Sequence, residues 1–424
     1  MNGKGALPLL IVLWAVNLAF MLSTGHVLFR FLFYLFTSLI TLSFVWVWQN
    51  LHGLEVERTV VSPKAQVGKI LEEEIVVRNR SSLPKFWLEV RDHSSLPAHV
   101  AGRVIGSIPP KREHRWSVKT LCRKRGVFTL GPVTVVSSDP LGLVRFEKVF
   151  PTKLEVTVYP PVYSLPHFKL LSGVLPGGEV VRQRAPYATT NVAGVRDYCP
   201  GDSFNRIHWP TTAHAGRLMV KEFELDPLSN VWIFIDLDRR VQKGEPWPRS
   251  FVESRGPSLF WAEGWALRPE PTTEEYAVAI AASLAAKLLR EKRALGLAAC
   301  SQARYILRPE RGLRQLLKVL DFLAVVRAEG DKPFEELLAS ESPFLEGNST
   351  VIAITPSEST RWVKVIQSMK MRGIDALAVI VAENPEDYRE VMAELRASAI
   401  PWILVRLGDE IPAAMDSGRV RWGT

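Results

Sequence analysis

The pattern of apolar and polar residues begins with two nearly uninterrupted apolar runs. Leu7–Leu22 and Val27–Trp48 are separated only by a short polar turn. Each run is close to the ~20 residues that an α-helix needs to cross a bilayer. A cleaved signal peptide is the alternative for the first run, but only Lys4 precedes it, no small-residue cleavage site follows, and a second run comes at once. We therefore predict a transmembrane helical hairpin in residues 1–50.

The ends of this hairpin indicate how it lies in a membrane. The bilayer would be contacted through Leu7–Trp48, with Trp46 and Trp48 at the interface, where aromatic belts form. Arg30 can extend to the surface beside the tip. A hairpin places both ends on one side, and three widely spaced cysteines are typical of a reducing compartment. We expect a cell-membrane protein with two spans and cytoplasmic soluble domains.

Residues 51–165 show a different pattern, in which apolar and polar positions alternate over short segments. The clearest alternating segments are 54–58, 74–78 and 87–90, with turn clusters at 79–82 and 108–110. Short alternating segments separated by turns are typical of a β-sandwich. We predict an all-β sandwich domain here and expect no catalytic role, because no base and nucleophile are paired in it.

From Val231 the pattern changes to short apolar runs alternating with amphipathic stretches. Strands are predicted at 231–235, 294–299, 350–354, 376–381 and 402–405, and helices at 272–293, 311–326, 358–371 and 385–396. Continuous apolar strands separated by helices predict a mostly parallel sheet covered on both faces. Right-handed crossovers then give a doubly wound α/β domain in residues 231–424.

Composition narrows the class of protein. The 424 residues are 47% hydrophobic and 23% charged, which suits two or three globular domains and argues against extensive disorder. The net charge is +9, but the basic residues are scattered and form no nucleic-acid motif. Because a cytoplasm-facing membrane protein has the same basic excess, we expect no nucleic-acid partner.

A dense polar and aromatic block precedes the first strand of the α/β region. It contains, in order, Arg196, Asp197, Tyr198, Pro200, Gly201, Asp202, Arg206, Ile207, His208 and Trp209. This order resembles the motif of the membrane proteins grouped as domain of unknown function fifty-eight (DUF58), except that His214 replaces a usual arginine. The resemblance implies a membrane anchor, a last domain similar to a von Willebrand factor A domain, and an association with a MoxR-type AAA ATPase.

The same block has three interpretations. We favour a structural one, in which residues 166–230 form a linker and a motif block that docks on the sheet through arginine–carboxylate pairs. A partner-binding surface is the first alternative. An acid/base set using His208 is the second, but the chain has no nucleophile elbow, phosphate loop or zinc motif. We therefore expect no catalytic residues.

Asp236 ends the first strand of the α/β region, where ligands bind in open α/β sheets. The resemblance to von Willebrand A domains implies a metal-ion-dependent adhesion site there, with an Asp-x-Ser-x-Ser loop suited to Mg²⁺. This loop reads Asp236-Leu237-Asp238-Arg239-Arg240, and the later loop offers Thr355, Ser357 and Glu358 but no aspartate. Because Arg240 cannot ligate a metal, we expect at most a degenerate site of Asp236, Asp238 and Ser357, with Mg²⁺ the one candidate cofactor. In the alternative, both aspartates pair with Arg239, Arg240 or the preceding basic residues.

An aromatic insertion at 239–271 separates the first strand from the first helix of the α/β region. Long loops of this kind are usually functional or disordered. Trp247, Trp261 and Trp265 are the candidate partner contacts, and a small satellite core is the alternative. The leading functional hypothesis is a membrane-tethered protein-interaction module that is not an enzyme. A Mg²⁺-dependent adhesion-type domain is the alternative, and a hydrolase is a weaker one.

Overall fold

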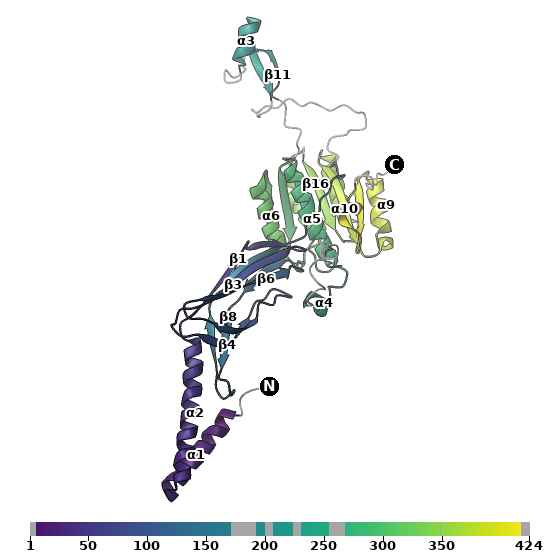
Figure 1. The fold of residues 1–424 in the computed structure, drawn as a ribbon. Coiled ribbons are helices and arrows are strands. Elements are labelled where there is room, and N and C mark those ends of the chain that lie inside the picture. Colours follow the sequence, from purple (N-terminus) through teal and green to yellow (C-terminus); the bar gives the residue numbers. More distant parts are fainter. Residues whose placement is uncertain are drawn as a thin grey trace. The chain divides into compact units, whose positions relative to one another are not determined.

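The chain forms two compact units in a computed structural model (Figure 1). The structure describes residues 6–170, 192–199, 207–223, 230–253, 268–347 and 349–416. The first unit comprises Met1–Pro160 and Trp247–Arg268, and the second comprises Pro161–Pro246 and Pro269–Thr424. The break after Pro160 is close to the predicted end of the sandwich at 165, and the first unit also takes in much of the aromatic insertion.

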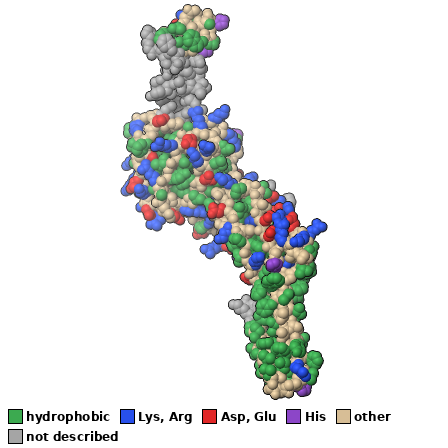
Figure 2. All heavy atoms as spheres, turned by 90° about the vertical axis from the view of Figure 1, so that its left-hand side faces the viewer, with side chains coloured by type: hydrophobic (Ala, Val, Ile, Leu, Met, Phe, Trp, Pro, Cys, Tyr) green, Lys and Arg blue, Asp and Glu red, His purple; other side chains and the backbone are tan. Residues whose placement is uncertain are grey.

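Two long apolar helices open the first unit, as the hydrophobic pattern predicts. They are α1 (Ala6–Thr24) and α2 (Val27–Leu51), and both are long and apolar enough to cross a membrane. The indole of Trp14 donates a hydrogen bond of 2.8 Å to the hydroxyl of Thr37, which joins the two helices. Hydrophobic side chains gather along their length in Figure 2.

The rest of the first unit is β-sandwich-like. Its strands are β1 (Leu54–Val60), β2 (Lys64–Gln66), β3 (Ile70–Asn79), β4 (Lys85–Asp92), β5 (Arg103–Ile108), β6 (Glu113–Leu121), β7 (Gly126–Leu130), β8 (Val133–Ser138), β9 (Arg145–Phe150) and β10 (Leu154–Tyr159). They form sheets of order β1-β3-β6, β5-β4-β8-β9 and β2-β10-β7. Alternate residues of the first two sheets, such as Ile75 and Val77 of β3 and Val133 and Val135 of β8, meet in one buried core.

The last turns of α2 belong to the same core as the sandwich. Val47 and Leu51 are buried among the core residues of the sheets. The backbone N–H of Phe86 donates to Asn50 Oδ1 at 3.1 Å, and the buried ammonium of Lys85 donates to the carbonyl of Gln49. A cation at the carboxyl end of a helix stabilises its exposed carbonyls. The apolar helix and the sandwich are therefore one packed body.

The second unit contains the α/β sheet. Its strands are β13 (Val231–Ile235), β14 (Leu295–Cys300), β15 (Arg304–Glu310), β16 (Thr350–Thr355), β17 (Asp375–Ala382) and β18 (Trp402–Arg406). Its helices are α5 (Thr273–Arg290), α6 (Leu313–Val325), α7 (Phe334–Glu341), α8 (Arg361–Met371), α9 (Arg389–Ala397) and α10 (Ile411–Ala414), with 3₁₀ turns at Ser342–Phe344 and Pro385–Tyr388. The strand order is β15-β14-β13-β16-β17-β18, and every pair is parallel except β14–β15.

The sheet is covered on both faces. Trp232 and Phe234 of β13 pack in a core with residues of α7, α8 and α9, whereas α5 contacts the central strands and α6 without joining that core. This is the strand order and layering of a doubly wound fold. Strands β14 and β15 lie on one side of β13 and strands β16 to β18 on the other, so the switch point of the sheet lies between β13 and β16. Short buried runs read from the sequence as strands are thus strands, within a few residues at each end.

Strand β15 and helix α7 are among the elements of this unit that the sequence pattern missed. Strand β15 is antiparallel at the sheet edge, with residues that are alternately exposed and half-buried and with Pro309 near its end. Proline is tolerated at such an edge but weakens a strand signal. Helix α7 has only 8 residues, too few to show a clear helical period. Leu165, at the end of the predicted sandwich, and Phe168, in the predicted linker, are buried and belong to the second unit.

Candidate functional site

The candidate site lies at the switch point of the sheet, between β13 and β16. β13 and β16 are neighbours, and their carboxyl ends carry Asp236 and Thr355. Both residues are almost wholly buried. Open α/β sheets bind ligands at this edge because the loops that follow adjacent strands diverge there. The predicted location of Asp236 is therefore the switch point of the sheet.

The carboxylate of Asp236 is held by neutral donors. The hydroxyl of Thr355 donates to its Oδ2 at 2.5 Å, and the backbone N–H of Asp238 donates to its Oδ1 at 3.1 Å. Burial raises the pKa of Asp236 to about 7, against the opposing effect of these hydrogen bonds. The group is thus close to half protonated at neutral pH.

Asp238 is instead neutralised by an arginine. Arg240 Nε lies 2.9 Å from Oδ1 of Asp238, and Arg240 Nη2 lies 2.7 Å from Oδ2, a two-pronged pair. Burial alone would raise the pKa of Asp238, but the hydrogen bonds and charge of Arg240 lower it below its usual value. Asp238 thus pairs with Arg240, as the alternative to metal binding predicts. Within the described ranges no basic side chain pairs with Asp236, and Arg239 instead contacts Asp331 at 2.8 Å.

Ser357 reaches this arrangement through the backbone rather than through its hydroxyl. Its N–H donates to Thr355 Oγ1 at 2.9 Å, while its own Oγ accepts from Ser359 N at 3.3 Å. Glu358 points elsewhere and pairs with Lys243, which also lies 3.2 Å from Asp387. The later loop therefore supports Asp236 but brings no second carboxylate to it.

Gln242 is a site residue that the sequence reasoning missed. Its amide donates to the carbonyl oxygens of Asp236 at 3.2 Å and Asp238 at 3.3 Å, and its own oxygen accepts from the Thr273 hydroxyl at 2.8 Å. The side chain thereby ties the loop after β13 to the start of α5. Its position a few residues after the aspartates is the only sequence signal that points to it.

These residues do not fit a Mg²⁺ ion. Mg²⁺ requires near-octahedral oxygen ligation and usually includes one or two carboxylates that are free to face it. Here both oxygens of Asp238 accept hydrogen bonds from Arg240, whose positive charge also repels a cation. Among the residues that the structure describes, no three His, Cys, Asp or Glu side chains could hold a metal ion. The positive charge of Arg240 balances the negative charge of Asp238, as a bound cation would.

The motif block forms a small element of its own. Strands β11 (Val192–Asp197) and β12 (Met219–Phe223) pair antiparallel, and helix α3 (Trp209–Ala215) lies between them in sequence. The ring of His208 caps α3, with Nδ1 accepting from Thr211 N at 3.3 Å. Ile207 and Val220 are buried and form a bridge. His208 therefore has a structural use at the start of this helix.

The remaining motif residues are described only in part. Asp197 pairs with Arg217 at 3.1 Å in an exposed position. Pro200, Gly201, Asp202 and Arg206 lie outside the described residues, as does the side chain of Arg196. Docking of the block on the sheet stays a prediction.

The aromatic insertion is described only at its start and its end. A short helix, α4 (Arg249–Glu253), follows Trp247, whose ring lies 5.2 Å from that of Phe251. The guanidinium of Arg123, on the sandwich, lies 4.8 Å from the Phe251 ring. Trp261 and Trp265 lie outside the described residues. Trp247 is half-buried in the first unit, so at this end the insertion contributes to a local packing cluster.

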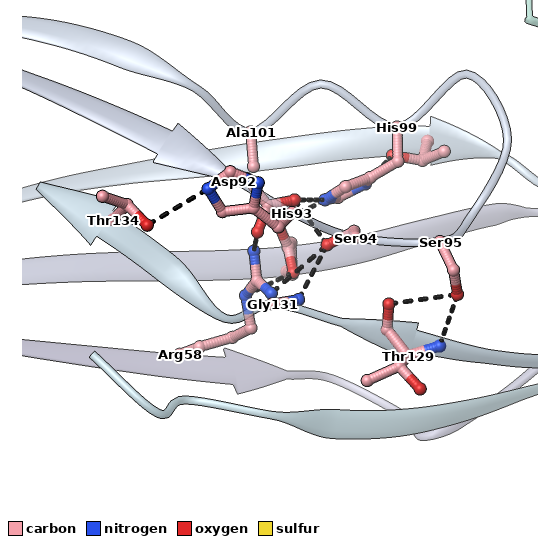
Figure 3. Close-up of polar contacts among 12 residues, drawn as sticks. Arg58, Asp92, His93, Ser94, Ser95, His99, Ala101, Thr129, Gly131 and Thr134 are labelled. Carbon is pink, nitrogen blue, oxygen red and sulfur yellow. Dashed lines mark hydrogen bonds and ion pairs between the residues drawn. The ribbon is translucent and has the colours of Figure 1, made fainter. Parts of the chain in front are cut away.

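A second polar cluster, which the sequence reasoning missed, lies inside the sandwich (Figure 3). Arg58 approaches Glu73 at 3.2 Å and Asp92 at 2.5 Å. His99 Nε2 lies 3.1 Å from Glu73 Oε1 and 3.3 Å from Asp92 Oδ2. All four side chains are buried, and they come from β1, β3, β4 and the loop after β4. Their spacing in sequence shows no motif, so only the fold brings them together.

The electrostatics of this cluster favour charged forms. Burial alone would raise the pKa of Asp92, but hydrogen bonds from His99 and Ser94 and the charge of Arg58 lower it to about 2. Burial alone would lower the pKa of His99, but its hydrogen bonds to Asp92 and Glu73 raise it. An open hollow of about 480 Å³ lies beside Asp92, His93 and His99. Because each charged side chain is paired with one of opposite sign, we interpret the cluster as structural.

Comparison with known proteins identifies the segment around the site. Residues 194–245 match the family model "Protein of unknown function DUF58". This segment is therefore similar to DUF58 proteins. The match confirms the family resemblance, and it includes both the motif block and the loop from Asp236 to Lys243. The matched segment therefore contains the part of the switch-point site that follows β13, whereas Thr355 and Ser357 lie outside it.

One curated relative extends the similarity beyond the DUF58 segment. "Uncharacterized protein YeaD" of Bacillus subtilis (strain 168) is 24% identical over 242 residues. The match covers 54% of this chain and 59% of YeaD, less than two thirds of that protein's length.

Solved structures resemble each unit only in part. The SpRpn10 VWA domain is 10% identical with a TM-score of 0.28, covering 44% of this chain and 93% of that one. The CARDB domain of PF1109 from Pyrococcus furiosus is 17% identical with a TM-score of 0.19, covering 25% and 86%. The strand order and layering described above carry the fold assignment.

Proposed function

We propose that this protein is a membrane-tethered protein-interaction module whose second unit presents the switch-point edge to a protein partner. The observation that carries the proposal is the closed, ion-paired state of that edge. The Asp238–Arg240 pair and the Asp236–Thr355 hydrogen bond use the groups that would otherwise bind a metal or act on a substrate. The protein would act by recognition, without a metal and without catalysis.

The surface of this edge suits a protein partner. The side chains of Arg239, Arg240 and Asp331 are more than half exposed, and those of Glu358 and Asp387 are about two fifths exposed. Exposed charges of both signs contribute to the specificity of an interface and to its association rate more than to its affinity. The family resemblance makes a MoxR-type AAA ATPase the candidate partner.

The membrane tether follows from α1 and α2. Both helices are apolar and long enough to span a bilayer, and they are mostly exposed rather than buried in a protein core. A helix that exposes large apolar residues on most of its surface is unstable in water and stable in lipid. The chain would lie in the cell membrane with two spans, and the sandwich and the second unit would lie in the cytoplasm.

Partner capture tests this proposal directly. The full-length chain is extracted from membranes in mild detergent, and co-purifying proteins are compared with those of a charge-reversed variant, Arg239→Glu/Arg240→Glu. We expect an ATPase to co-purify with the wild-type chain and to be lost from the variant. The matched control is Arg115→Glu, an exposed, ion-paired arginine on β6 in the other unit. Equal recovery from all three proteins, or recovery of no partner, would refute the proposal.

A further inference from the structure

The first unit carries an apolar tip that lies beside Ser43 and Phe44 of α2. The tip is the β8–β9 turn, Pro140–Leu143, which follows Asp139. Leu141 is 60% exposed there, and Phe146 on β9 is 40% exposed. Leu141 is a large apolar residue on an exposed turn, where side chains are normally polar.

Contacts within the first unit fix this tip against α2. The hydroxyl of Ser43 donates to Asp139 Oδ2 at 3.2 Å, and the rings of Phe44 and Phe146 lie 5.8 Å apart. Ser43 is buried against the sandwich, on the same helical face as Val47. The turn is therefore held beside residues 43–44 of the helix.

The length of α2 indicates how deep Ser43, and the turn beside it, would lie relative to the membrane interface. The apolar run Val27–Trp48 has a length of about 33 Å at 1.5 Å per residue, close to the ~30 Å of a bilayer's hydrocarbon core. Trp46 and Trp48 are both exposed and stand at the end of this run, where interfacial aromatic residues lie. Ser43 is three to five residues earlier, so it lies ~5–7 Å deeper than these tryptophans. A turn bonded to Ser43 is then at or below the membrane interface.

Backbone N–H groups of the tip are paired within the turn, which lowers the cost of moving it from water into lipid. The carboxylate of Asp139 is buried and accepts hydrogen bonds from the backbone N–H groups of Leu141 at 3.1 Å and Val144 at 2.7 Å. The carbonyl of Asp139 accepts from Gly142 N at 3.0 Å. Backbone polar groups must be paired inside before a segment can enter an apolar phase. The turn presents Pro140, Leu141 and Gly142 outward.

We propose that the β8–β9 turn inserts Leu141, flanked by Phe146, into the interfacial region of the lipid bilayer. The sandwich would then be a membrane-seated domain, held by the turn as well as by α2, and its orientation to the membrane would be fixed. This inference rests on the membrane tether of the proposed function. The occupant of the surface is lipid, because the surface is continuous with the exposed apolar face of α2.

Fluorescence quenching in lipid tests the proposal. A Cys199→Ser background removes the exposed cysteine, since Cys122 and Cys300 are buried. An environment-sensitive fluorophore is attached to Leu141→Cys in the full-length chain, which is reconstituted in phosphatidylcholine nanodiscs with or without bromine on the upper acyl chain. We expect the Leu141 probe to emit at shorter wavelength in lipid and to lose emission with the brominated lipid.

Two matched probes separate the possible failures. Leu42→Cys, on the exposed face of α2, reports the span itself. Val61→Cys follows the far end of β1, ~20 Å of extended chain away from α2. We expect quenching at Leu42 and none at Val61. If the Leu42 probe is quenched and the Leu141 probe behaves like Val61, the turn lies outside the lipid and the inference fails. If the Leu42 probe is not quenched, the membrane tether itself is wrong.

Discussion

The buried carboxyl of Asp236 should make the second unit less stable as pH rises. Its pKa is about 7 in the folded chain against 3.8 for the free group, so the folded state holds its proton over a wider pH range. Stability from this group is therefore greatest below pH 3.8, falls as pH rises toward 7, and is constant above. A difference of about 3 pKa units corresponds to roughly 4 kcal/mol at 1.36 kcal/mol per unit.

Asp236→Asn removes this charge while keeping its hydrogen bonds. The amide oxygen can accept from Asp238 N, and the amide N–H can donate to Thr355 Oγ1. We expect the variant to be more stable than wild type by about 2–4 kcal/mol at pH 8.5 and by about 1 kcal/mol or less near pH 4.5. The upper value applies if no interaction with the ionised form is lost.

Thermal unfolding of the full-length chain in detergent measures this difference. Midpoints of wild type and Asp236→Asn are compared from pH 4.5 to 8.5, with the fluorescence of the buried Trp362 and Trp402 reporting the second unit. Glu390→Gln, an exposed carboxyl-to-amide change on α9, is the control and should leave the midpoint nearly unchanged at every pH. The reasoning fails if Asp236→Asn has the same offset at all pH values, or if it is the less stable protein at pH 8.5.

Three further predictions concern the other charged groups. Arg58→Met leaves the buried carboxylates of Glu73 and Asp92 with His99 in place but without the arginine, and we expect the sandwich to lose about 3–5 kcal/mol, measured by urea unfolding of the full chain; a loss below 1 kcal/mol would contradict the buried pairing. The depressed pKa of Asp92, about 2, means that its stabilisation is complete above pH 4 and is lost as pH falls toward 2. Acid titration of the melting midpoint should therefore be steeper for wild type than for Asp92→Asn, and equal slopes would refute this. Millimolar Mg²⁺ should not shift the melting midpoint. A shift that Asp238→Ala abolishes would contradict this prediction and would support a Mg²⁺ site at Asp238.

Much of the architecture was determined by the sequence itself. Two apolar runs of helical length, period-two alternation in the sandwich, and buried runs between amphipathic helices each specify an element by local burial. The DUF58 motif likewise depends on local order along the chain. These signals need no knowledge of distant residues, which is why β13 and the two apolar helices were located within a few residues.

The candidate site depended on the tertiary structure. Asp236 was identifiable because it ends a strand, but its Thr355 partner is 119 residues away and is brought in only by the pairing of β13 with β16. The cluster around Arg58 and the seating of the β8–β9 turn against Ser43 likewise arise from long-range packing. Burial and proximity decide whether a carboxylate is protonated, ion-paired or free for a ligand. Because both are properties of the folded chain, the sequence could name Asp236 but could not show that the fold closes its site.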